Sequence, residues 1–133
     1  EVALENAKRL GLTDRTGFRK SDWFSHVVGR FGMILSNPPY IRSGDMKTLM
    51  TDVKDYEPHT ALDGGEDGLD AYRHIIRDAP GYLTTDGWLL FEVGYDQAGA
   101  VSDLMAVAGA NDIEQHKDLS SIARVVVGKF NAF

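Results

Sequence analysis

One stretch decides the fold that this chain is expected to adopt: Phe31-Gly32-Met33-Ile34-Leu35-Ser36-Asn37-Pro38-Pro39-Tyr40. Its first six residues form a short, mostly apolar run, which predicts a buried β-strand. Its last four predict a rigid polar loop, because each proline fixes φ and removes a backbone N–H. In open α/β sheets, ligands bind at the carboxyl ends of the strands. We therefore expect a binding site at this loop.

The chemical groups of the loop suit a planar –NH2 group. The side chain of Asn37 carries a carbonyl acceptor, and the prolines leave loop carbonyls free to accept from a ligand. Tyr40 offers a flat aromatic face. We interpret the loop as a site where an amide or amino nitrogen is held for methylation. The structural alternative is a turn with an asparagine cap and a core tyrosine, and the apolar strand directly before the loop favours the functional interpretation.

Length and composition indicate one globular domain, residues 1–133, with 43% hydrophobic and 26% charged side chains. The first residues lack the basic segment of a signal peptide. Cysteine is absent, which excludes disulfides and thiolate metal sites and fits a cytoplasmic protein. The 4 histidines are scattered without the spacing of metal ligands, so no metal site is expected.

The charge balance concerns the class of substrate. There are 14 basic and 20 acidic side chains, which gives a formal net charge of −6. A protein that binds duplex DNA normally neutralises phosphates with a basic face, and the basic residues here are scattered along the chain. The balance therefore weighs against a nucleic-acid substrate, and we expect the acidic segment 63–70 to be an exposed loop.

Hydrophobic periodicity predicts alternating helices and strands, which is typical of an α/β sheet with helices on its faces. Helices are expected at 2–10, 68–79 and 96–108, and strands at 18–20, 31–36, 88–93, 113–117 and 124–130. Tyr72, Ile75 and Ile76 share one helical face and are expected to be core, and the continuous apolar run 88–93 is typical of a parallel strand buried on both faces. The last two strands should form a closing antiparallel pair. The long connection 41–68 is expected to be a functional loop.

Several single residues carry narrower predictions. Gly11 and Gly109 are expected to end helices in the left-handed region. Asp96 is a candidate N-cap for the helix at 96–108. Glu92 ends an apolar strand, where a buried carboxylate would need a partner, and we expect a structural role for it. The segment Thr84-Thr85-Asp86-Gly87 predicts a turn before the strand at 88–93.

Taken with its neighbours, the loop resembles the corresponding part of the HemK/PrmC family. These are N5-glutamine methyltransferases that act on peptide chain release factors with S-adenosyl-L-methionine as methyl donor. The resemblance covers nearly the whole chain, with one small departure at Gly32, where the family usually has an aspartate. The matching segments lie at 6–12, 21–24, 36–41, 56–58, 61–62, 65–69, 92–97, 117–119 and 124–128.

The resemblance implies a Rossmann-like class I S-adenosylmethionine-dependent methyltransferase fold and assigns roles to particular residues. It implies that Asn37, Pro38 and Tyr40 are catalytic, and that they bind the substrate amide together with Pro39 and Glu57. It also implies that Asp22, Trp23 and Asn37 contact the cofactor, with Trp23 packed on the adenine. Asp22 and Trp23 follow the expected strand at 18–20, where spacing alone favours a core role. The resemblance reverses that interpretation for Trp23 and leaves Asp22 undecided. At Glu57, a solvated turn is nearly as good an interpretation.

The resemblance further implies that parts of the enzyme lie upstream of Glu1. These are the first strands with their glycine-rich cofactor loop, an acidic ribose-binding residue and a helical N-terminal domain. We therefore expect the chain to correspond to the C-terminal part of the catalytic domain, and to be inactive and weak in cofactor binding on its own. Loss of the first strands should also leave an exposed sheet edge, which invites self-association.

The resemblance implies methylation of the glutamine of a Gly-Gly-Gln motif in a release factor. A glutamine methyltransferase acting on a ribosomal protein is a close variant. An adenine-N6 methyltransferase acting on nucleic acid shares the loop but should carry a basic groove. A non-catalytic binding module is the third alternative.

Overall fold

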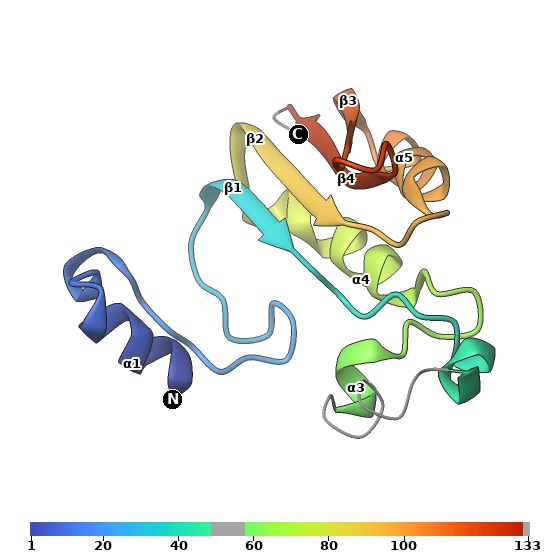
Figure 1. The fold of residues 1–133 in the computed structure, drawn as a ribbon. Coiled ribbons are helices and arrows are strands. Elements are labelled where there is room, and N and C mark those ends of the chain that lie inside the picture. The colour runs from blue at the N-terminus through green and yellow to red at the C-terminus, as the bar shows by residue number, and fades with distance from the viewer. Residues whose placement is uncertain (49–57, 132–133) are drawn as a thin grey trace.

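A computed structural model describes residues 1–48 and 58–131 (Figure 1). The helices and strands alternate over most of the chain. In order they are α1 (Val2–Arg9), η1 (Thr13–Arg15), β1 (Phe31–Ser36), η2 (Ser43–Thr48), α3 (His59–Leu62), α4 (Asp70–Asp78), η3 (Ala79–Tyr82), β2 (Leu83–Glu92), α5 (Ala98–Val107), β3 (Ala110–Lys117) and β4 (Ala123–Phe130). Within these residues, no helix is long and apolar enough to cross a membrane.

The strands form one sheet in the order β1-β2-β4-β3. β1 and β2 are parallel, with Leu35 opposite Leu90. β4 is inserted antiparallel between β2 and β3, with Phe91 opposite Val126. The sheet therefore has the closing antiparallel pair that the sequence predicts, and β1, the strand before the loop, lies at its edge.

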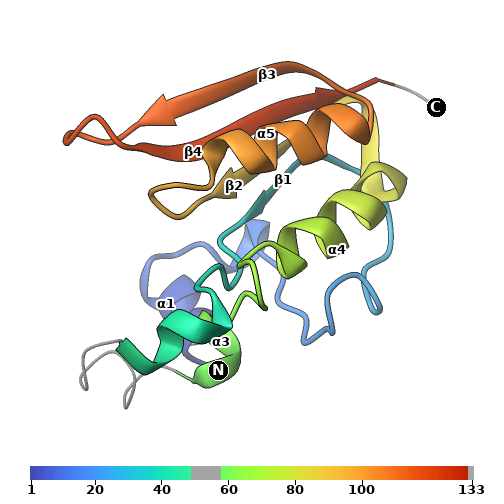
Figure 2. The same ribbon diagram turned by 90° about the vertical axis from the view of Figure 1, so that its right-hand side faces the viewer.

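The hydrophobic core lies on one face of this sheet. Helices α4 and α5 lie on the same side of the sheet (Figure 1 and Figure 2). They pack on the inward side chains of β2 and β4, including Leu89, Phe91 and Val126, which are fully buried. The helical stripe predicted at Tyr72, Ile75 and Ile76 is buried here and is confirmed as core.

The other face of the sheet carries no long helix among the described residues, and this corrects two predictions. β1 was expected to be buried, but Met33 and Leu35 are 51% and 69% exposed. β2 was expected to be buried on both faces, but Trp88 and Leu90 are half-buried on the side away from the helices. The physical reason is that β1 has one neighbouring strand and that α4 and α5 both cover the opposite face. The expectation of an exposed edge beside the loop is confirmed.

Two local predictions about strands are also wrong. Residues 18–20 are exposed and form no strand. Residues 84–87 belong to β2, although the strand is irregular where the turn was predicted. Asp86 has φ 61, and the register with β1 shifts across this segment.

The acidic side chains near the end of β2 have other roles than those predicted. Asp96 forms an ion pair with Arg42 at 3.0 Å, and the N-cap position of α5 is Gln97. Glu92 is exposed at the end of the strand, so its carboxylate needs no buried partner. The predicted helix ends are confirmed, because Gly11 and Gly109 have φ 67 and 96 directly after α1 and α5.

Candidate active site

The loop Asn37–Tyr40 leaves the carboxyl end of β1, beside the carboxyl end of the parallel strand β2. Asn37 is exposed, Pro38 is buried, and Pro39 and Tyr40 are half-buried. Burial of Pro38 fixes the backbone in the middle of the loop, while Asn37 stays accessible to a ligand. The loop therefore lies at the carboxyl ends of the parallel strands, where α/β proteins bind their ligands.

Two hollows flank the loop. One, of about 470 Å³, is lined by Pro39 together with Trp23 and His74. The other, of about 360 Å³ and mostly apolar, is lined by Asn37 together with Leu35 and further residues at the ends of β1, β2 and β4. Asn37 and Pro39 thus line different hollows.

Trp23 reaches the first hollow from an irregular segment rather than from the end of a strand. Its backbone has φ 51, and Ser21 Oγ holds the turn by donating to the Trp23 carbonyl at 2.8 Å. The indole lies against the His74 ring of α4, with 5.1 Å between ring centroids and 34° between planes. The structure thus brings Trp23 and Pro39 together. Asp22 is exposed and lines neither of these hollows.

The backbone after the loop is held by a short bridge to the segment before α4. Ile41 donates to the Leu62 carbonyl at 3.0 Å, and Gly64 donates back to the Ile41 carbonyl at 2.7 Å. Ser43 adds a side-chain hydrogen bond to Asp63 at 2.7 Å. These hydrogen bonds join the start of the long connection, just after the loop, to its later part, just before α4. Glu57, predicted to contact substrate, lies outside the described residues.

Sequence reasoning missed one residue of this site, Gln97. Its side-chain Nε2 donates to the Tyr40 carbonyl at 2.9 Å, so it contacts the last residue of the loop from the start of α5. The available signal was its place in the 92–97 segment, where a long amide side chain precedes the apolar stripe of a helix. Its partner is 57 residues away in the sequence, which no local pattern reveals.

Electrostatics around the site are set by neutral and paired groups. Burial raises the pKa of the Tyr72 phenol, so this residue is a neutral donor at ordinary pH. Its hydroxyl donates to the Glu92 carbonyl at 2.8 Å, at the end of β2. The hydrogen bond and charge of Asp96 raise the pKa of Arg42, which stays a cation on the loop's far side. Arg73 lowers the pKa of Asp67 to about 2, mainly through a hydrogen bond between the two side chains.

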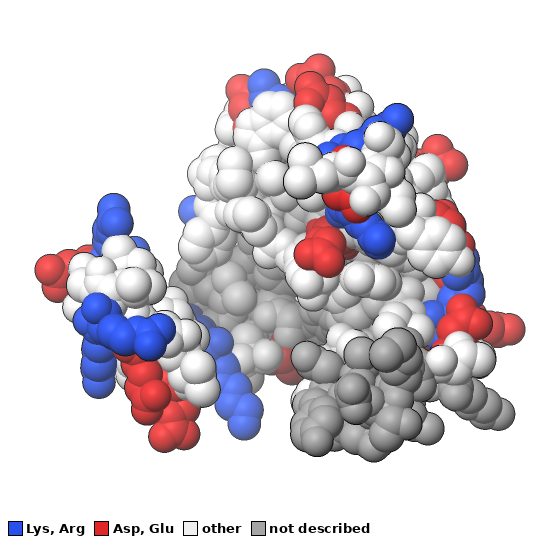
Figure 3. All heavy atoms as spheres, in the orientation of Figure 1, with Lys and Arg blue, Asp and Glu red and all other residues white. Residues whose placement is uncertain are grey.

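Charge on the surface is mixed. On the face shown in Figure 3, the described Lys and Arg side chains are interspersed with Asp and Glu and do not gather into one patch. In the described part of the chain there is also no group of three His, Cys, Asp or Glu side chains placed to hold a metal ion.

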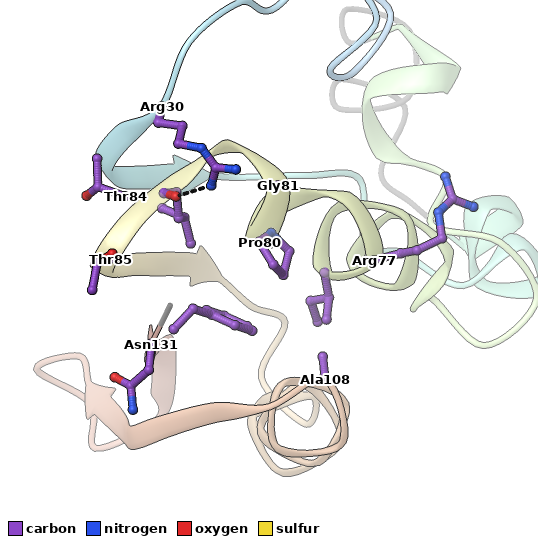
Figure 4. Close-up of a pocket in the computed structure, with 11 residues that line it drawn as sticks. Arg30, Arg77, Pro80, Gly81, Thr84, Thr85, Ala108 and Asn131 are labelled. Carbon is purple, nitrogen blue, oxygen red and sulfur yellow. Dashed lines mark hydrogen bonds between the residues drawn. The ribbon is translucent and has the colours of Figure 1, made fainter. Parts of the chain in front are cut away.

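A larger cavity, of about 670 Å³, lies at the other end of the parallel strands, near the start of β2 (Figure 4). Apolar side chains such as Leu83 and Pro80 line it, and Arg30 spans one side by donating to the Leu83 carbonyl at 2.9 Å. Because ligands of open α/β sheets bind at the carboxyl ends of the strands, we place the candidate site at the loop instead.

Comparison with known proteins shows which proteins the chain is similar to. The chain is 46% identical over 131 residues to a release factor glutamine methyltransferase of Cereibacter sphaeroides, covering 98% of this chain and 47% of that protein. It is 44% identical over 131 residues to the protein of that name in Rhodospirillum rubrum, covering 98% of this chain and 40% of that protein. The chain is similar, over nearly its whole length, to part of the release factor glutamine methyltransferases. The resemblance to the HemK/PrmC family is thereby confirmed.

The chain spans about half the length of these curated methyltransferase relatives. No protein-family profile matches it. Among solved structures, a methyltransferase from Pyrococcus furiosus superposes with a TM-score of 0.65 at 16% identity, over 97% of this chain and 56% of that one. The predicted α/β fold is confirmed, because the chain shares its fold with that methyltransferase and has a mixed sheet of four strands in the described residues.

Proposed function

We propose that the complete gene product carrying these residues methylates the side-chain amide nitrogen of a glutamine in a peptide chain release factor, with S-adenosyl-L-methionine as the methyl donor. One observation carries the proposal: Asn37 lies exposed where β1 ends, on a loop whose middle is fixed by the buried Pro38. The names of the methyltransferase relatives support the same chemistry.

The loop addresses the weakness of an amide as a nucleophile. The nitrogen lone pair of a carboxamide is delocalised into its carbonyl. Acceptance of the two N–H groups by the Asn37 side-chain oxygen and the Pro38 carbonyl would orient that nitrogen toward the donor methyl. Positive charge would develop on the nitrogen as the N–C bond forms and the methyl–sulfur bond of the donor breaks, with the sulfur leaving as a neutral thioether, and both acceptor dipoles would stabilise that charge. The Tyr40 ring would stack on the flat amide, and the surplus proton would leave to water at the exposed Asn37.

The residues present fit the cofactor in part. The methyl donor supplies a carbon bound to a positively charged sulfur. Trp23 and Pro39 both line the first hollow, and an aromatic indole there suits a flat heterocycle such as adenine. We propose that Trp23 packs on the adenine, with Asp22 near it, and that Asn37 lies between the donor and the acceptor amide.

The narrower substrate is the glutamine of a Gly-Gly-Gln motif, as the family resemblance implies. An enzyme that acts on release factors works where translation ends, in the cytoplasm. The competing adenine-N6 activity needs a basic groove, whereas the basic side chains visible in Figure 3 are interspersed with acidic ones.

The test uses the complete gene product, purified release factor and S-adenosylmethionine with a labelled methyl group. We expect label in the release factor, and a loss of about a hundredfold or more in rate for Asn37→Ala, the scale for removing one polar group that stabilises a transition state. Asn111→Ala is the matched control, because Asn111 is an exposed asparagine on β3. A rate for Asn37→Ala within twofold of the unaltered protein, or label in duplex DNA instead, overturns the proposal.

A further inference from the structure

Gln97 has 3% of its surface exposed and is the one buried residue with an amide or charged side chain among the residues that the structure describes. Each end of its amide is used. Nε2 donates to the Tyr40 carbonyl at 2.9 Å and to the Gly68 carbonyl at 3.2 Å, and Oε1 accepts from the Gly94 N–H at 2.9 Å. A buried amide with partners for both ends is held in one position.

The orientation of this amide follows from its partners. A flipped amide would place its oxygen against two carbonyls and its NH2 against a backbone N–H, which removes all three hydrogen bonds. Tyr72 closes the site from α4, with its hydroxyl 3.5 Å from Oε1 while it donates to the Glu92 carbonyl. Gln97 therefore offers its donors to Tyr40 and Gly68 in one arrangement only.

Three separate segments meet at this side chain. They are the end of the loop at Tyr40, the segment 64–69 before α4, and the turn after β2 at Gly94. Without Gln97, the described hydrogen bonds of the loop end would begin only at Ile41, with the bridge to Leu62 and Gly64. The Gln97 amide thus holds the loop one residue nearer to Asn37–Pro39.

Glycines let the backbones approach this closely. A Cβ on Gly64 would lie 2.7 Å from Tyr40 Cα, nearer than real side chains come. Gly68 has φ 76, and a Cβ there would lie 2.5 Å from the Tyr40 carbonyl oxygen. The surroundings of the Tyr40 peptide therefore leave its carbonyl little freedom to turn away from Gln97.

We propose that Gln97 is a positioning residue for methyl transfer: by holding the Tyr40 carbonyl, it fixes the backbone that presents Asn37 and Pro38 to the substrate amide. The inference rests on the proposed function for its catalytic consequence. It does not require contact between Gln97 and substrate, since its hydrogen bonds act through Tyr40.

The main test replaces Gln97 by Met in the complete gene product. Gln97→Met keeps an unbranched side chain of similar size and removes the donors and the acceptor. We expect amide hydrogen exchange at Ile41, Ser43 and Gly64 to quicken about tenfold or more, the effect of losing one ordinary hydrogen bond. At a temperature where circular dichroism shows full folding, we expect kcat to fall about tenfold, with KM for release factor changed less than threefold.

Two further variants guard against a purely structural explanation. Gly68→Ala keeps the Gln97 amide but places a Cβ 2.5 Å from the Tyr40 carbonyl oxygen and 2.7 Å from Gln97 Nε2. It therefore disturbs the same hydrogen bond from the other side, and it should give the same loss of kcat and the same faster exchange. Gln115→Leu is the matched control, because Gln115 is an exposed glutamine whose side chain bonds to Ser102. Its exchange and kcat should stay within twofold of the unaltered protein.

The possible outcomes separate the two proposals. If Gln97→Met lowers the melting temperature but leaves kcat and the three exchange rates within twofold, Gln97 is only structural and the inference is overturned. If the unaltered protein does not methylate release factor, the proposed function fails. In that case, faster exchange in Gln97→Met still supports the claim that Gln97 holds the loop through the Tyr40 carbonyl, and unchanged exchange refutes that claim.

Discussion

Leu89 and Leu90 are adjacent leucines on β2 that face opposite sides of the sheet. Leu89 is fully buried under α4 and α5, whereas Leu90 is half-buried on the side away from both helices. Replacement of each by alanine removes the same atoms from the same strand. The difference between the two variants therefore measures how well each face of the sheet is covered.

The expected sizes follow from burial. Leu89→Ala removes roughly three buried CH2-sized groups at about 0.8 kcal/mol each, and the cavity left behind brings the loss to about 3 kcal/mol. Leu90→Ala removes groups that are already partly in water, so the loss should be about 1 kcal/mol. With a urea dependence of about 1.5 kcal/mol per molar, the unfolding midpoint should fall by about 2 M for Leu89→Ala and by under 1 M for Leu90→Ala.

The assay is urea unfolding of this chain, followed by circular dichroism at a dilute concentration where light scattering shows a monomer. Equal losses for the two variants would refute the claim that helices cover one face only. Midpoints that rise with protein concentration would show that the chain self-associates, as the exposed edge at β1 invites.

Three further predictions concern the pairing of Asp67 with Arg73, the binding of the cofactor, and the close approach of Gly64 to the Tyr40 backbone. Because the pKa of Asp67 is lowered to about 2 in the folded chain, its pairing with Arg73 stabilises the fold above about pH 4 and is lost as the pH falls through about 2. Thermal midpoints should therefore be higher than for Asp67→Asn at pH 5 to 7, with a gap that narrows toward pH 2. Isothermal titration of these 133 residues with S-adenosylmethionine should show weak or undetectable binding, and micromolar affinity would contradict this. Gly64→Ala should lower the free energy of unfolding by about 2 kcal/mol or more, because its Cβ would meet the Tyr40 backbone, whereas Gly99→Ala, with open space around it, should be close to neutral.

The sequence predicted the features that depend on local chemistry. The limits of β1, the left-handed glycines at Gly11 and Gly109, and the closing strand pair all follow from residue types within a few positions. The turn predicted at residues 84–87 was wrong, because this segment is part of β2, where Asp86 has a positive φ.

The features that depend on neighbours in space could not be predicted in this way. The apolar run Phe31–Ser36 suits a strand in the middle of a sheet as well as a strand at its edge. The exposure of β1 was therefore missed. Trp23 was placed after a strand that does not form, yet it reaches Pro39 through an irregular turn held by Ser21. Gln97 escaped notice because its partner Tyr40 is distant in sequence.

Tandem mass spectrometry tests the central claim most directly. A release factor is incubated with the complete gene product and S-adenosylmethionine, and its peptides are sequenced. The account predicts one added methyl group on the side-chain nitrogen of the glutamine in the Gly-Gly-Gln motif, and its loss with Asn37→Ala. A methyl group on a lysine or a carboxylate, or an unchanged yield with Asn37→Ala, would contradict a loop that holds a planar amide for methylation.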